Sequence, residues 1–196
     1  MKVFSVLLLL PALLWWGLQV YPADNAGRPS PPATHICQDT LKKPVVSLEE
    51  TLAGPMHVVM IRDTAETAAH IHLVLNRDYQ ELFMFTQQNA LKTGKVMVFY
   101  HSARPPFILD AAVETDSLPD QTTGRIRINK YKEGNVLIAH YQGPYEQIGM
   151  AYTAISAWLR EHQKTGIHTP FEVYLNNPAM VKDSYELRTD VYQYIK

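Results

Sequence analysis

The residues with the clearest potential for binding chemistry lie at the end of the chain, where one acid stands among aromatic side chains. Residues 187–195 read as a strand, and side chains alternate along a strand. Asp190 would therefore share a face with Tyr192 and Tyr194. A carboxylate between aromatic rings suits a small lipophilic cation, because it supplies charge while the rings supply area and cation–π attraction. An ion pair with Arg188, or plain exposure to solvent, is the alternative explanation.

Three further aromatic residues could complete this site. Tyr145 begins a predicted helix beside a strand end, Tyr174 lies on a middle strand, and Phe99 is its counterpart in the first half of the chain. Packing in an aromatic core is the alternative role for each of them. The predicted ligand-binding residues are therefore Asp190, Tyr145, Tyr174, Tyr192 and Phe99.

Other kinds of chemistry have weaker support. His70 and His72 are two residues apart, so on a helix they would point in different directions, and no third ligand has suitable spacing. The chain has no Gly-x-Ser-x-Gly, His-Glu-x-x-His or phosphate-loop motif. Its one cysteine, Cys37, lies in a polar, proline-bearing stretch and is expected to be incidental or paired with another molecule. We predict no metal, no cofactor and no catalytic residue.

The elements that must position the site fall into two similar halves. Each half is expected to run strand, helix, strand, strand, so we predict an α+β fold of duplicated β-α-β-β repeats with pseudo-twofold symmetry and a central cleft. In this alignment Ala112 matches Asp190, so only the second half would carry the acid. The expected strands are 56–61, 96–100, 107–113, 125–131, 136–141, 171–175 and 187–195; the expected helices are 66–91, ended by Gly94, and one that starts at Pro144 and is ended by Lys164 and Gly166.

The N-terminal part reads as a targeting segment and a linker. Residues 1–21 hold one lysine and then an apolar run, which predicts an uncleaved membrane anchor or a cleaved signal peptide. Residues 22–44 are proline-rich and predict an extended linker before a domain at 45–196. The domain would then be periplasmic or secreted. A net charge of -1 over 196 residues does not favour binding to nucleic acid, which usually calls for a basic face.

Three motifs in the second half resemble the GyrI-like family, the AraC-type effector-binding domains. They are HYQGPY at 140–145, FEVYLNNP at 171–178 and ELRTDVY at 186–192. The resemblance implies a duplicated fold with a central cleft that binds small, often cationic and lipophilic molecules. It also implies an acid on the last strand, usually glutamate, which is Asp190 here.

The resemblance leaves three hypotheses for function. The first is an exported or membrane-tethered domain that captures a small molecule. The second is a hydrolase of reactive, cyclopropanoid-type compounds, as in some relatives, which would use Asp190 with Tyr145 or Tyr174. The third is a scaffold whose cleft holds a segment of a partner protein. Many relatives carry a DNA-binding helix-turn-helix, but only the linker precedes the domain here, so we expect no nucleic-acid partner.

Overall fold

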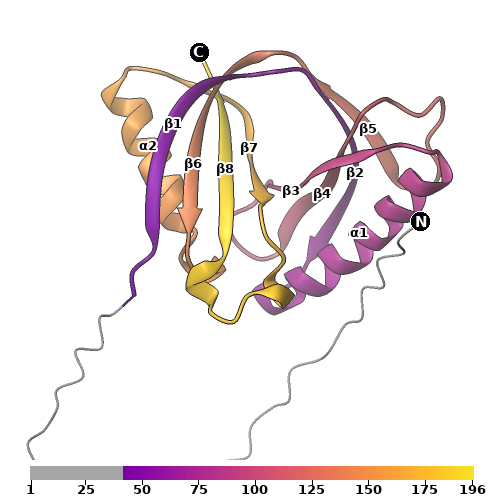
Figure 1. Ribbon diagram of the computed structural model, residues 1–196, viewed down its shortest axis with the longest axis horizontal. Coiled ribbons are helices and arrows are strands. Elements are labelled where there is room, and N and C mark those ends of the chain that lie inside the picture. The colour runs from indigo at the N-terminus through magenta and orange to yellow at the C-terminus, as the bar shows by residue number, and fades with distance from the viewer. Residues whose placement is uncertain (1–41) are drawn as a thin grey trace, which may run out of the picture. The chain divides into compact units, whose positions relative to one another are not determined.

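A computed structural model describes residues 42–196 as one antiparallel sheet of eight strands with two helices, which confirms the α+β class (Figure 1). The strand order across the sheet is β1-β6-β8-β7-β3-β4-β2-β5. The elements are β1 (Val45–Ala53), β2 (Met56–Ala65), α1 (Ile71–Gln88), β3 (Thr93–Tyr100), β4 (Phe107–Thr115), β5 (Ile126–Tyr131), β6 (Gly134–Gln142), α2 (Gly149–Glu161), β7 (Gly166–Tyr174) and β8 (Arg188–Ile195). Short 3-10 turns precede both helices and β8.

The connections between strands require the sheet to curl. β1 and β2 stand six places apart in the sheet, yet only Gly54 and Pro55 join them. A flat sheet would separate these strands by roughly 29 Å, whereas a two-residue link spans at most about 10 Å. β5 and β6 are joined in the same way by Lys132 and Glu133. Both links cross at the same end of the molecule and bring the two edges of the sheet together (Figure 1).

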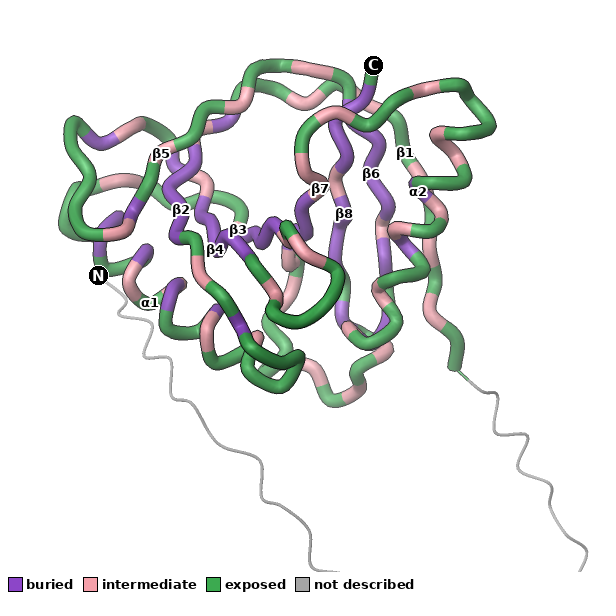
Figure 2. Tube along the Cα trace, turned by 180° about the vertical axis from the view of Figure 1, so that it is seen from behind, coloured by how far each residue is buried: buried purple, intermediate pink, exposed green. Residues whose placement is uncertain are grey.

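The curl gives the sheet an inner and an outer face. Both helices pack on the outer face: Leu82 of α1 and Ile155 of α2 belong to its two apolar clusters. The inner face is formed by strands and their connections alone. Rings from the two halves meet there, since Phe99 of β3 and Phe171 of β7 lie 4.9 Å apart between ring centroids. Figure 2 shows that buried residues follow the middle strands of the sheet.

The strand register gives a residue-by-residue correspondence between the two halves that differs from the one in the sequence alignment. Arg62 lies opposite Asp110 in the β2–β4 ladder, and His140 lies opposite Asp190 in the β6–β8 ladder. Asp110 and Asp190 each stand five residues before the end of their strand. Asp110, not Ala112, is therefore the counterpart of Asp190, and the expectation that only the second half carries an acid was wrong. That the halves descend from a duplication stays a prediction.

Several boundaries differ from those predicted. The strand β1 was missed, although its edge position and alternating exposure fit an antiparallel strand with one wet face. Residues 66–70 are not part of α1, which begins at Ile71 after a 3-10 turn. The helices end earlier than Gly94 and Gly166 suggested, because Ala90 and Gln163 adopt the left-handed conformation just after them, with φ of 53° and 54°.

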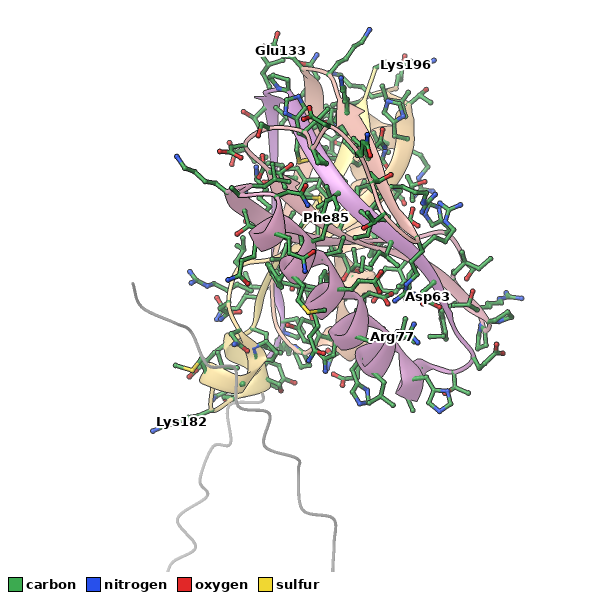
Figure 3. All side chains as sticks on the ribbon, turned by 90° about the vertical axis from the view of Figure 1, so that its right-hand side faces the viewer. Asp63, Arg77, Phe85, Glu133, Lys182 and Lys196 are labelled. Atoms are coloured by element: carbon green, nitrogen blue, oxygen red, sulfur yellow. The ribbon has the colours of Figure 1, made fainter. Side chains whose placement is uncertain are left out.

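A cluster of charged side chains ties α1 to the strands beneath it. Arg125 pairs with Asp63, with Glu81 at 2.9 Å and with the fully buried Asp78 at 2.7 Å. Arg77 of α1 reaches Asp63 as well, and Figure 3 shows these two side chains next to each other. This network fixes the middle of α1 to β2 and to the residue before β5.

The predicted signal or anchor and most of the predicted linker lie outside residues 42–196. Within that range, neither helix has the length and apolar character needed to cross a membrane.

Candidate functional site: a buried carboxyl among tyrosines

Glu172 lies at the centre of the sheet, on its outer face. It stands on β7 directly opposite Val98 of β3, at the junction between the two halves. The residues beside it in the chain, Phe171 and Val173, point to the inner face and pack in its apolar cluster. Glu172 is 4% exposed, so strand alternation has placed a carboxyl group in the interior beneath the two helices.

Tyrosines from both halves surround this carboxyl group. The hydroxyl of Tyr152 on α2 donates to Glu172 Oε1 at 2.9 Å, and that of Tyr174 lies 3.4 Å from Oε2. Tyr145 packs edge-on against Tyr174 with ring centroids 5.6 Å apart. Tyr79 of α1 and Tyr100 of β3 complete the shell. Burial raises the pKa of both hydroxyls, and the nearby charge of Glu172 raises it further.

Burial raises the pKa of Glu172 to about 7, and the hydrogen bonds from Tyr152 and Tyr174 only partly oppose this shift. Among residues 42–196 the hydrogen-bond partners of Glu172 are hydroxyls, and no lysine or arginine neutralises it. Burial also raises the pKa of Tyr174 and Tyr145, so the shell stays uncharged. The site is thus an apolar, aromatic environment around one acid that ionises near neutral pH.

The structure divides the five predicted site residues between the two faces of the sheet. Tyr145 and Tyr174 lie in the Glu172 shell, whereas Asp190, Tyr192 and Phe99 face the inside of the curl. The predicted pairing of Asp190 with either tyrosine is therefore not formed.

Asp190 has a partner of its own. It is buried and lies 2.8 Å from Nδ1 of His140, whose Nε2 lies 3.1 Å from Glu49. Burial alone would lower the pKa of His140, but the hydrogen bonds to Asp190 and Glu49 outweigh it and raise that pKa. An imidazolium that donates to both carboxylates satisfies all three groups, and Arg188 is not the partner.

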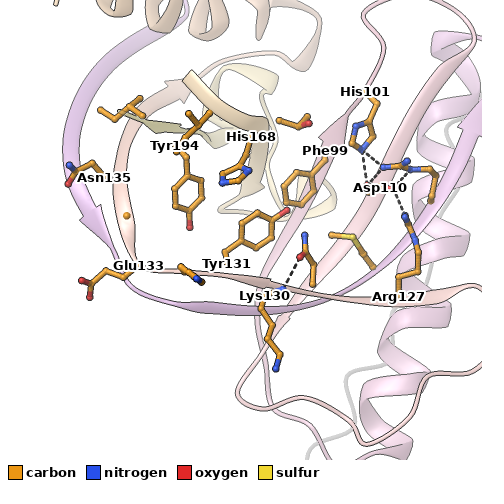
Figure 4. A pocket seen from close by; sticks show the side chains of 18 residues that line it. Phe99, His101, Asp110, Arg127, Lys130, Tyr131, Glu133, Asn135, His168 and Tyr194 are labelled. Atoms are coloured by element: carbon orange, nitrogen blue, oxygen red, sulfur yellow. Dashed lines mark hydrogen bonds and ion pairs between the residues drawn. The ribbon is translucent and has the colours of Figure 1, made fainter. Parts of the chain in front are cut away.

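Two hollows open on the inner face. The first has a volume of about 600 Å³ and includes Phe99, Asp110 and Tyr131 in its wall (Figure 4). The second has a volume of about 340 Å³ and includes Tyr192. Tyr194 contributes to both.

Sequence reasoning missed Glu172 although a signal was present. Glu172 stands between the apolar residues Phe171 and Val173, and alternation places it on the same face as Tyr174. The acid and the tyrosine could have been paired from that spacing alone. Which helix residues would cover them could not be read from the strand.

No group of three or more His, Cys, Asp or Glu side chains within residues 42–196 is arranged to hold a metal ion. Cys37 lies outside this range.

Comparison with known families agrees with this geometry. The profile of the GyrI-like small molecule binding domain matches residues 50–196. The chain belongs to the GyrI-like family. Comparison with curated proteins gives no match.

Solved structures share the GyrI-like fold at low sequence identity. EcmrR in an EcmrR–DNA complex is 16% identical with a TM-score of 0.66; the match covers 77% of this chain and 57% of EcmrR. A hydrolase from Listeria innocua is 11% identical with a TM-score of 0.57, over 76% of this chain and 91% of the hydrolase. SAV2435 bound to tetraphenylphosphonium is 14% identical with a TM-score of 0.52, over 76% of this chain and 94% of SAV2435. The chain thus spans little more than half of EcmrR.

Proposed function

We propose that this GyrI-like domain binds a small lipophilic cation at Glu172, between the two halves of the domain. The observation that carries the proposal is a buried carboxyl group surrounded by tyrosines, with no cationic side chain paired to it within residues 42–196. A buried carboxylate is costly without a counter-charge. A bound cation would supply that charge, and the rings of Tyr145 and Tyr174 would add cation–π attraction and apolar contact.

The pKa of Glu172 supports the same choice of ligand. Because the pKa of Glu172 is about 7, the acid is neutral in the empty site at lower pH. A bound cation would stabilise the charged carboxylate. SAV2435, a protein of the same fold, was solved with the lipophilic cation tetraphenylphosphonium bound. The same compound is a suitable probe for this chain.

Calorimetric titration of the full chain with tetraphenylphosphonium at pH 8 tests the proposal. Glu172→Gln should weaken binding at least about tenfold, which corresponds to about 1.4 kcal/mol. Glu161→Gln, which removes an exposed acid at the end of α2, is the matched control and should bind like the parent chain. Equal affinities for the parent and Glu172→Gln would exclude Glu172 as the counter-charge.

A hydrolase is the second candidate, and the contact between Tyr152 and Glu172 favours it. A carboxyl group with a pKa near 7 and a hydroxyl at 2.9 Å could act as general base and proton donor on a strained electrophile. Incubation with cyclopropane-bearing electrophiles should then give water-addition products with the parent chain and none with Glu172→Gln. Product formation at the buffer rate by the parent chain would contradict this candidate.

We further propose that the domain is exported, with residues 1–21 as an anchor or signal and residues 22–44 as a linker. The lysine and apolar run at the N-terminus support this. Fractionation of cells that express the full chain or residues 22–196 provides the test. Export or membrane association only of the full chain is expected, and identical soluble cytosolic fractions would oppose it.

A further inference from the structure

The first hollow on the inner face combines an aromatic wall with a cationic end, and it is separate from Glu172, which lies on the outer face. Its wall comes from four strands: Phe99 lies on β3, Tyr131 on β5, His168 on β7 and Tyr194 on β8 (Figure 4). At about 600 Å³ it falls in the range of small-molecule sites, roughly 300–1,000 Å³.

The aromatic wall consists of near-parallel rings. Tyr131 lies between Phe99, at 5.8 Å and 10°, and Tyr194, at 5.9 Å and 14°, measured between ring centroids and planes. His168 meets Tyr131 and Tyr194 with its edge, at 89° and 86°. Rings stacked this closely leave no gap between them, and together they form an aromatic wall on which a flat ring can pack.

His168 reaches this wall because the backbone of β7 is irregular there. The β7–β8 register shifts between Ile167 and Phe171, and His168 has a φ of 63°, a left-handed conformation that is uncommon for residues other than glycine. The buried amide of Gln193 donates to the carbonyl of Ile167 at 2.9 Å and so stabilises the bulge. Such bulges redirect side chains and are frequent beside binding sites.

The other end of the hollow carries positive charge held in place by Asp110. Both oxygens of this buried carboxylate accept from Arg62 at 2.8 Å, and one also accepts from Arg127 at 2.8 Å. His101 lies 2.7 Å from the second oxygen. One carboxylate thus fixes two guanidinium groups, whose side chains remain 48% and 45% exposed and keep further N–H donors.

The remaining charges around the hollow do not cancel this excess. Lys130 and Lys132 also line it, and Glu133 is the only acid besides Asp110 in its described lining. A guanidinium binds carboxylate and sulfonate oxygens through paired N–H groups, which gives both attraction and orientation.

We propose that this hollow is a second binding site, which takes a small planar aromatic anion such as an aryl carboxylate. The ring packs on the aromatic wall of Tyr131 and Tyr194, and the carboxylate accepts from Arg127 and Arg62. The two faces of the sheet therefore select ligands of opposite charge, with a cation at Glu172 and an anion in the hollow.

The test compares 2-naphthoate with 2-naphthamide, which has the same rings and no charge, by calorimetry on the full chain. The carboxylate should bind at least about tenfold more tightly. Arg127→Gln should remove this difference, and it leaves Asp110 with Arg62 and His101. Arg160→Gln, a loss of one exposed cation on α2, is the control and should keep the difference.

A second variant tests the aromatic wall independently of the charge. His168→Gly suits the positive φ and should weaken both naphthalene ligands by a similar factor, several-fold or more. Glu172→Gln should leave both affinities unchanged, which separates this site from the proposed cation site. Amide chemical shifts of Tyr131 and His168 should change on addition of 2-naphthoate.

Three results would overturn the second site. The first is equal affinity for the two naphthalene ligands, or no binding of either at millimolar concentration. The second is an equal loss for Arg127→Gln and Arg160→Gln, which would mean a general effect of net charge. The third is that 2-naphthoate changes amide chemical shifts only in the Glu172 shell.

Discussion

The hydroxyl of Tyr152 lies 2.9 Å from Oε1 of Glu172, so one hydrogen bond joins α2 to the centre of the sheet. The donor favours the charged form of the carboxyl group, while burial opposes it. Any displacement of α2 would remove the donor and change the ionisation of Glu172. The helix and the proposed binding acid are therefore linked through a single contact.

The stability of the domain should depend on pH through Glu172. Its pKa in the folded state, about 7, lies above the ordinary value of 4.5, so the folded protein binds more protons between these values. The free energy of unfolding should consequently fall as pH rises from about 4.5 to 7, by up to roughly 3 kcal/mol. Urea denaturation at pH 5 and pH 8 should show this fall for the parent chain and a smaller one for Glu172→Gln. An equal fall in the free energy of unfolding for the two proteins would contradict a raised pKa of Glu172.

Removing the hydroxyl of Tyr152 should shift the pH dependence of cation binding. Affinity for tetraphenylphosphonium should increase as pH rises through the pKa of Glu172, because the carboxylate is the binding form. Tyr152→Phe removes a donor to that carboxylate, so the midpoint should move up by about one pH unit. Tyr185→Phe changes a tyrosine outside the Glu172 shell, in the turn before β8, and serves as the control. Calorimetry between pH 5 and 9 provides the midpoints.

The two equivalent acids of the inner face should differ in their contribution to stability. Asp110→Asn disrupts contacts with two arginines and a histidine and should cost roughly 2 kcal/mol, whereas Asp190→Asn affects one histidine and should cost about 1 kcal/mol. Chemical denaturation at pH 7 measures both. A smaller loss of stability for Asp110→Asn than for Asp190→Asn would show that solvent replaces the contacts of Asp110 with the two arginines.

The Asp110 cluster should also contribute to acid sensitivity. Burial would raise the pKa of Asp110, but hydrogen bonds from Arg62 and His101 lower it below 3.8. A carboxyl group with a lowered pKa stabilises the folded state above its unfolded pKa and loses this contribution as pH falls through the folded value. The parent chain should therefore lose stability below about pH 4, and Asp110→Asn should lose less over the same interval. An equal loss of stability below about pH 4 for the two proteins would contradict a lowered pKa of Asp110.

His140 should titrate above its ordinary pKa of 6.5 because it lies between Asp190 and Glu49. Its stabilising contribution is complete below 6.5 and is lost as pH rises through the higher, folded value. An NMR titration of the ring resonances should give this pKa directly. Asp190→Asn should lower it, and a value unchanged by the substitution would mean that the pairing is not formed in solution.

Much of the fold was predictable because it depends on local patterns. Alternation identified the strands that carry Phe99, Tyr174 and Asp190, and the GPY turn marked the approach to α2. The edge strand β1 was missed since its pattern includes several polar residues. The helix ends were misplaced because Ala90 and Gln163 adopt a conformation for which glycine was expected.

The sequence by itself determined the family, the class of fold and which side chains share a face of each strand. Alternation is a property of a single strand, so it needs no partner. Only the tertiary structure decided that the sheet curls, that Asp190 is paired with His140 inside the curl, and that both helices cover Glu172 on the outer face. These outcomes depend on contacts between segments far apart in the chain, and the strand order and the packing of the helices fix such contacts.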